Sequence, residues 1–220
     1  MKTDLSASYT GLPESSANEF NRIRNAVLLL TDYGRSPKTV LVASSEHGEG
    51  ATTIATHLSR GLAEHPGAKP LRLDFNFRSA DRKSSESRSK GLADWLFDGF
   101  KEEYIREDRR APGCSVLDGG KVDCHPSRII ESSDFQPYMD KLKEMFNFVV
   151  IDAPPLQPYP ETTLLASRVD GVILVVRAEG PRREVVMDAV KKLHEVHANI
   201  YGVVLNQRKH YIPGWIYRRI

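Results

Sequence analysis

Short runs of apolar residues recur along the chain, and the segments between them carry apolar residues at helical spacing instead. The runs predict strands at 39–43, 71–74, 115–117, 148–152, 171–176 and 200–205. Within most of these runs nearly every position is apolar, rather than every second one. That pattern is typical of strands in a parallel sheet whose two faces are both covered.

The intervening segments predict helices. Between 18 and 33, Phe20, Ile23 and Val27 fall roughly on one helical face. Further helices are predicted at 52–63, 91–97, 135–146 and 183–196. Strands that alternate with helices favour an α/β fold, in which a doubly wound, mostly parallel sheet carries helices on both faces. In such folds ligands bind beyond the carboxyl ends of the strands.

Length and composition fit a single domain of this kind. The chain has 220 residues, of which 40% are hydrophobic and 27% charged, and a chain of this size can bury a full core. We expect a flexible tail at 1–17, the α/β domain at 18–207, and a basic and aromatic tail at 208–220. No apolar run is long enough for a membrane span and the first residues lack the apolar core of a secretory signal, which predicts a cytoplasmic protein.

Charge and cysteine content argue against several classes of function. The net charge is only +2, so no overall field favours nucleic acid as a partner. The segment 78–90 is rich in serine and arginine but lacks interleaved aromatic residues, which predicts a surface loop rather than a nucleic-acid site. Cys114 and Cys124, with the neighbouring His125, match no zinc spacing and are predicted to be free thiols.

The segment ASSEHGEGATT (43–53) has the layout of a phosphate-binding loop between a strand and a helix. Backbone N–H groups and a helix N-terminus can cradle phosphates there. Thr52 is placed to coordinate magnesium and Thr53 to contact the α-phosphate. Active loops carry a lysine just before this threonine, and here that position is Ala51. The predicted nucleotide-binding residues of the loop are Gly48, Glu49, Gly50, Ala51, Thr52 and Thr53.

Two other predicted strands end in carboxylates. Asp152 follows a buried run, as the carboxylate of a Walker B motif does, and Asp74 ends the run at 71–74. Because the carboxyl ends of parallel strands meet at one edge of a sheet, these residues should converge with the loop. The sequence therefore predicts ATP or ADP with Mg²⁺, held by Thr52, Asp74 and Asp152, with Arg78 contacting the nucleotide. Asp74 and Asp152 are also the candidate catalytic residues.

Taken together, these motifs resemble the cytosolic domain of the bacterial tyrosine kinases, the polysaccharide co-polymerase kinases of capsule and exopolysaccharide export. These kinases are relatives of the MinD/ParA ATPases. The resemblance covers the chain from about residue 18 to its end. The family's phosphate loop, Asp-x-Asp-x-Arg motif and Walker B region appear as SSEHGEGATT (44–53), DFNFR (74–78) and FNFVVIDAPP (146–155). The segments HPSRII (125–130), LASRVDGVILVVR (165–177) and GVVLN (202–206) also match.

The chain departs from the family at two positions of the phosphate site. Ala51 replaces the loop lysine, and loss of one such preorganised group typically lowers a rate by about 10²–10³-fold. Asn76 replaces the second acid of Asp-x-Asp and cannot serve as a base or a charged ligand. Each change also has a structural explanation, because alanine is the best helix former and asparagine can hydrogen-bond the next turn. Arg78 or a partner subunit is an alternative source of the missing charge.

Two further departures concern assembly and phosphorylation. The family's Glu-x-x-Arg-x-x-Arg assembly motif reads Asn18-x-x-Asn21-x-x-Arg24, which keeps only the last arginine. The family's tyrosine-rich C-terminus is reduced to Tyr211 and Tyr217. Monomer, dimer and ring are all compatible with these features, so a homo-oligomer stays open.

The four departures together favour a pseudokinase with a regulatory or scaffolding role, which binds nucleotide weakly or not at all. An active ATP-dependent tyrosine autokinase and a ParA/MinD-like positioning ATPase are the alternatives. The resemblance implies a separate membrane polysaccharide co-polymerase as partner, at the inner face of the cell membrane. Arg24, Trp215 and Tyr217 are the predicted interface residues. The tail could instead dock on anionic lipid, or fold back on the domain with Trp215 packed.

Overall fold

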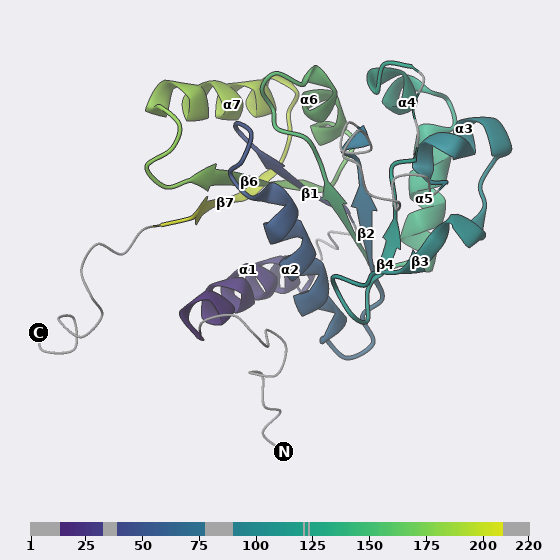
Figure 1. The fold of residues 1–220 in the computed structure, drawn as a ribbon, viewed down its shortest axis with the longest axis horizontal. Coiled ribbons are helices and arrows are strands. Elements are labelled where there is room, and N and C mark those ends of the chain that lie inside the picture. The colour runs from purple at the N-terminus through teal and green to yellow at the C-terminus, as the bar shows by residue number, and fades with distance from the viewer. Residues whose placement is uncertain (1–13, 33–38, 78–89, 121, 123, 209–220) are drawn as a thin grey trace, which may run out of the picture.

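The computed structural model describes residues 14–32, 39–77, 90–120, 122 and 124–208. Its centre is a seven-stranded sheet in the order β3-β4-β2-β5-β1-β6-β7 (Figure 1). All neighbouring strands are parallel except β3, which pairs antiparallel with β4 at one edge. The strands are β1 (Thr39–Ser44), β2 (Pro70–Asp74), β3 (Ile105–Glu107), β4 (Ser115–Leu117), β5 (Phe148–Asp152), β6 (Gly171–Arg177) and β7 (Ile200–Asn206). The predicted α/β fold with a mostly parallel sheet is confirmed.

Helices cover both faces of the sheet (Figure 1). One face carries α1 (Glu14–Asp32) and α2 (Ala51–Ala63). The other face carries α3 (Trp95–Asp98), α4 (Ser127–Glu131), α5 (Phe135–Met145), α6 (Pro160–Ala166) and α7 (Arg183–Glu195). Side chains alternate along β1, so that Val40 and Val42 pack toward α2 whereas Leu41 and Ala43 pack into the opposite core. Both faces of the central strands β1, β2, β5 and β6 are therefore buried, as the continuous apolar runs predicted, whereas the apolar run of β7 is partly exposed.

Several short elements were not predicted from the sequence. β3 has three residues, α4 five and α6 seven, which is too short for a hydrophobic period to be visible. The helix predicted at 91–97 is instead a 3₁₀ turn, Leu92–Asp94, followed by α3. Backbone N–H groups of Leu92 and Ala93 donate to the carbonyls of Asp118 and Gly119, so tertiary contacts shape this turn.

α1 begins at Glu14, inside the segment 1–17 that was expected to be a tail, and it packs on α2. The ring of Phe20 lies 4.3 Å from that of His57 between centroids. Arg24, a predicted interface residue, is only 7% exposed, and its guanidinium lies 3.4 Å from the carboxylate of Glu64 just beyond α2. In the described structure Arg24 therefore joins two segments of one chain. None of the described helices has the length and apolarity that a membrane crossing requires.

The central strands should carry most of the stability. Leu174 on β6 is fully buried, whereas Leu205 on β7 is 62% exposed. We expect Leu174→Ala to lower the free energy of unfolding by about 2–5 kcal/mol, because it leaves a cavity in the core. Leu205→Ala, the matched control, should change it by less than about 0.5 kcal/mol. Urea unfolding of both variants measures the difference, and equal losses would contradict the described edge position of β7.

Candidate functional site

The candidate site lies at the carboxyl ends of β1, β2 and β5, where residues 45–50 connect β1 to α2. Gly48 and Gly50 have φ angles of 80° and 95°, and a side chain at Gly50 would overlap the amide of Asn206. Gly50 is the N-cap residue of α2 and has no side chain that could bond the first N–H groups of the helix. The first intrahelical bond runs from the Ile54 N–H to the Gly50 carbonyl. The N–H groups of residues 51–53 thus precede the helical ladder, which makes this end of α2 suited to an anion.

The side chain of Glu49 holds the loop from inside. It is 1% exposed, and one carboxylate oxygen accepts hydrogen bonds from the Ser45 N–H (2.8 Å), the Ser45 hydroxyl (2.7 Å) and the Glu46 N–H (3.0 Å). The other oxygen accepts from the N–H of Arg177 at the end of β6 (3.2 Å). Because the carboxylate is engaged within the protein, Glu49 can offer a nucleotide only its backbone.

Neighbouring segments hold the loop from two more sides. At the end of β7, the side-chain amides of Asn206 and Gln207 donate to the carbonyls of Glu49 (2.8 Å) and Gly48 (3.0 Å). After β5, two backbone N–H groups donate to carbonyls at the start of the loop. The ring of His47 lies within hydrogen-bonding distance (3.0 Å) of the Tyr159 hydroxyl. The loop therefore takes its shape from the protein itself.

The predicted magnesium ligands lie together beside this loop. Asp74 and Asp152 are paired across β2 and β5, so their side chains project on the same face at adjacent strand ends. The hydroxyl of Thr52 donates to one oxygen of Asp152 (3.2 Å). The backbone N–H of Asn76 donates to the carboxylate of Asp74 (2.9 Å), a bond that an aspartate at this position would make as well.

Burial makes both carboxylates unusual. Burial, with a smaller contribution from Asp74, raises the pKa of Asp152 to about 7. Burial also raises the pKa of Asp74, although the Asn76 N–H and the charge of Arg72 act in the opposite direction. Two enclosed carboxylates and a hydroxyl are the oxygen ligands that Mg²⁺ prefers. The residues present therefore fit a magnesium ion and, at the N-terminus of α2, a phosphate.

The position of the loop lysine is part of the core. Ala51 is 7% exposed and packs with Ile54, Ala55 and Val150 in the cluster between α2 and the sheet. It brings no charge to the site. Thr53 is exposed at the first turn of α2. Arg78, Trp215 and Tyr217 lie outside the described residues.

Sequence reasoning missed a buried ion pair below the site. Arg72 on β2 is fully buried and its Nε donates to the carboxylate of Asp108 at 2.6 Å. Asp108 itself is 2% exposed. The signal for this pair in the sequence was an arginine between Leu71 and Leu73 in an otherwise apolar strand. An arginine in such a place indicates a buried charge that needs a partner inside the fold. Nothing in the sequence around Asp108 indicated its partner.

Comparison with known proteins gives consistent relatives, although no family model matches the chain. Tyrosine-protein kinase CpsD of Streptococcus agalactiae is 27% identical over 191 residues, which is 86% of this chain and 82% of that protein. Putative tyrosine-protein kinase EpsB of Ralstonia solanacearum is 23% identical over 197 residues, which is 89% of this chain but 26% of EpsB. In EpsB the matching region is thus one part of a much longer protein.

Solved structures show the same fold. The kinase domain of VpsO matches with a TM-score of 0.73 and 27% identity, over 89% of this chain and 98% of that one. The chimerical protein CapA2B2 matches with a TM-score of 0.79 and 24% identity, over 94% and 90% of the two chains. Cobyrinic acid a,c-diamide synthase from Mycobacterium smegmatis, solved with an ATP analogue and magnesium, has a TM-score of 0.55 at 18% identity, over 76% of this chain and 72% of that one. The last two are likenesses of fold alone.

Removal of the Glu49 carboxylate should unfold the loop. Glu49→Ala leaves three N–H groups and the Ser45 hydroxyl without their acceptor, and both groups of Ser45 are buried. We expect the free energy of unfolding to fall by about 3 kcal/mol. Glu46→Ala, one turn earlier in the same loop, is the matched control and should cost less than about 0.5 kcal/mol. Guanidinium unfolding of the two variants tests this, and equal costs would contradict the anchoring role.

Stability should depend on pH through Asp152. Its pKa rises from an ordinary 3.8 to about 7 on folding, so between about pH 4 and 7 the native state keeps a proton that the unfolded chain has released. The free energy of unfolding should therefore fall as pH rises through this window, by at most about 1.4 kcal/mol per pH unit, and level off above it. Asp152→Asn should flatten this slope, whereas Asp140→Asn, on the exposed side of α5, should leave it unchanged. A slope that survives in Asp152→Asn would assign it to another group.

Proposed function

Since this chain is a homologue of the bacterial tyrosine-protein kinases, we propose that it is a kinase-like protein with a regulatory or scaffolding role in bacterial polysaccharide biosynthesis and export. In this role it binds nucleotide weakly or not at all and transfers no phosphoryl group. Its partner is a separate membrane polysaccharide co-polymerase, which places it at the inner face of the cell membrane. The relatives named as tyrosine-protein kinases support the setting, and the phosphate site supports the loss of transfer.

The observation that carries the proposal is Ala51. At the start of α2 a cation would face the phosphates and neutralise the charge that develops during transfer. A methyl group packed into the core occupies that position instead. Asn76 adds to the loss, because its side chain is a neutral amide where the family has a second carboxylate. Its backbone N–H donates to Asp74.

The same geometry explains how some nucleotide affinity could survive. The N–H groups at the start of α2 attract a phosphate, and Thr52, Asp74 and Asp152 would hold magnesium when it is present. The chain contributes the ligands and the loop that orients the phosphates; the metal would supply charge that Ala51 does not. This retained arrangement is the observation that favours the alternative, an active tyrosine autokinase.

A membrane partner is supported by how the relatives are built. EpsB carries its matching region within a chain roughly four times as long, because the match covers 26% of it. CapA2B2 is named as a chimerical protein, and the match covers 90% of it. In the proposal, the companion of this chain is the membrane co-polymerase, as a separate protein. Arg24, Trp215 and Tyr217 are the residues proposed to serve such an interface.

Restoring the lysine tests the proposed loss of function. Wild-type protein with Mg·ATP should show little or no thermal shift and no phosphotyrosine by mass spectrometry. Ala51→Lys should strengthen Mg·ATP binding by about tenfold or more, because it adds one charge-assisted contact to phosphate. Ser133→Lys, between α4 and α5, adds the same charge away from the site and should not. Isothermal titration of the three proteins gives the comparison.

Two results would overturn the proposal. ATP-dependent phosphate on a tyrosine of the wild-type protein would identify an active kinase. A change from monomer to dimer on adding Mg·ATP, seen by size-exclusion chromatography with light scattering, would favour a ParA/MinD-like positioning ATPase instead.

A further inference from the structure

A buried arginine lies one pleat below the paired carboxylates. Arg72 precedes Asp74 by two positions on β2, so both side chains project from the same face of the strand. Leu71 and Leu73 pack into the core on the opposite face, so this is the face that α2 covers. Across the sheet, Arg72 pairs with Val150 and Asp74 with Asp152. The guanidinium therefore lies in the same layer as the two site carboxylates.

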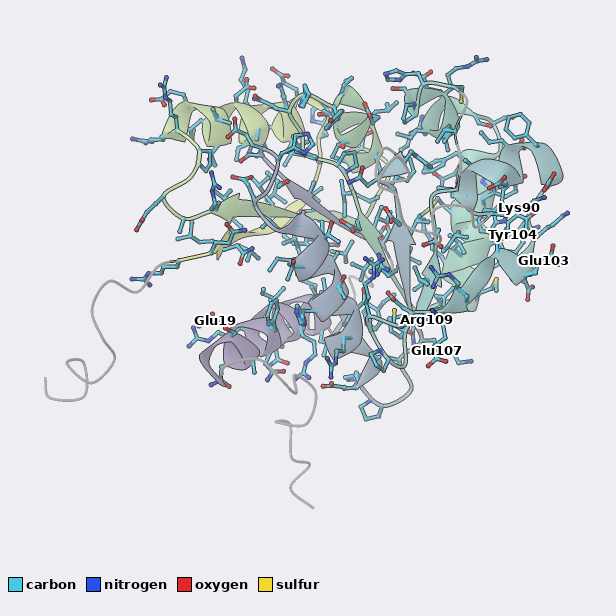
Figure 2. All side chains as sticks on the ribbon, viewed as in Figure 1. Glu19, Lys90, Glu103, Tyr104, Glu107 and Arg109 are labelled. Atoms are coloured by element: carbon cyan, nitrogen blue, oxygen red, sulfur yellow. The ribbon has the colours of Figure 1, made fainter. Side chains whose placement is uncertain are left out.

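Only one of the three guanidinium nitrogens of Arg72 has a hydrogen-bond partner among the described residues. Its Nε donates to Asp108 (2.6 Å), which lies in the connection between β3 and β4. Figure 2 labels the residues on either side of Asp108, Glu107 and Arg109, at the edge of the molecule away from the phosphate loop. Both terminal nitrogens of Arg72 are buried and find no hydrogen-bond partner within the part of the chain that the structure describes. A guanidinium has five N–H donors, so most of them are left over.

If Arg72 offset only the charge of Asp108, the carboxylates of Asp74 and Asp152 would lack a buried cation in their layer. The charges of three carboxylates, those of Asp74, Asp108 and Asp152, act on the fully buried guanidinium of Arg72. Arg110 also acts on the site carboxylates, but its side chain is 55% exposed and its effect is correspondingly screened. A buried cation with unsatisfied donors is costly unless opposite charge lies near. Asp74 and Asp152 supply that charge when they are ionised, which for Asp152 means above about pH 7, and Arg72 acts on both of them in return.

We propose that Arg72 is the cation that holds the carboxylate pair Asp74–Asp152 in place, compensating for the absence of a lysine at Ala51. Arg72 is a positioning residue in this arrangement, because a fully buried side chain acts through the carboxylates and not on a ligand. The carboxylates stay side by side without a metal because one guanidinium in their layer offsets part of their repulsion. The inference rests on the proposed site but requires neither nucleotide binding nor a partner. The competing interpretation is that Arg72 serves only to anchor Asp108.

A double-mutant cycle separates the two interpretations. The cycle is built on Asp108→Asn, so that removing Arg72 leaves no unpaired charge at Asp108. Within it, Asp74→Asn is introduced with Arg72 present and with Arg72→Met. Melting temperatures are measured without metal or nucleotide at about pH 8.5, above the pKa of about 7 for Asp152, so that this carboxylate is ionised. With Arg72 present, Asp74→Asn should be neutral or destabilising. With Arg72→Met it should raise the melting temperature by about 5 °C or more, since it removes one of two neighbouring carboxylates that have no cation beside them.

Restoring the missing lysine provides a second readout. Ala51→Lys should recover most of the melting temperature lost by Asp108→Asn/Arg72→Met, and should give a smaller gain where Arg72 is present. Mg²⁺ alone, added to the same proteins, should raise the melting temperature more in the variant without Arg72. If Mg²⁺ has no effect while the Asp74 cycle still shows coupling, the magnesium site of the proposed function fails and the role of Arg72 stands.

A surface carboxylate supplies the control. Asp140→Asn on α5, where the side chain is 56% exposed, should show no coupling to Arg72→Met. An Asp74 cycle that is additive within about 2 °C, together with no preferential rescue by Ala51→Lys, would overturn the proposal and leave Arg72 as an anchor for Asp108. If Asp108→Asn/Arg72→Met does not fold, recovery of folding by Asp74→Asn or Ala51→Lys supports the proposal. Failure of both to restore the fold contradicts it.

Discussion

The parallel pairing of β2 with β5 forces two carboxylates together at the edge of the sheet, and the rest of the site depends on how their repulsion is met. Asp74 and Asp152 are register partners, so no rearrangement of side chains alone can separate them widely. Like charges in an enclosed place favour protonation or a cation. The Thr52 hydroxyl and the Asn76 N–H each offset part of this cost, and Arg72 lies in the same layer. A metal ion would complete the compensation in the way that the oxygen ligands suggest.

The phosphate loop is held by a different carboxylate, and this separates its shape from its chemistry. Glu49 accepts hydrogen bonds from three backbone N–H groups and one hydroxyl, and the amides at the end of β7 bind the loop from outside. None of these contacts involves position 51. A loop built in this way can hold its conformation with alanine at position 51, because none of the bonds that shape it uses that side chain. The proposed regulatory or scaffolding role requires this combination of a retained fold and a site without the cation.

The strands and long helices could be predicted because their signals are local. β5 has the predicted bounds, and most other long elements differ from prediction by a residue or two at their ends. β3, α4 and α6 could not be predicted, since they depend on tertiary contacts and are too short to show a period. At the site, the spacing of Asp74, Asp152 and the glycine loop sufficed to bring them to one edge. The inward turn of the Glu49 side chain could not be foreseen, because its partners include Arg177, more than a hundred residues away.

By itself, the sequence determined the order of the longer strands and helices, the loop with its alanine, and the carboxylates at the strand ends. Each of these features depends on residues close together in the sequence, through the spacing of apolar residues or the residue types of a single turn. The tertiary structure alone decided which charges share a buried space. Arg72 and Asp108 are 36 residues apart and form an ion pair only because β2 and the β3–β4 connection pack beneath α2. Arg24 is likewise enclosed between α1 and the end of α2. Burial is a property of the assembled fold, and the energy of a charge depends on burial more than on its neighbours in sequence.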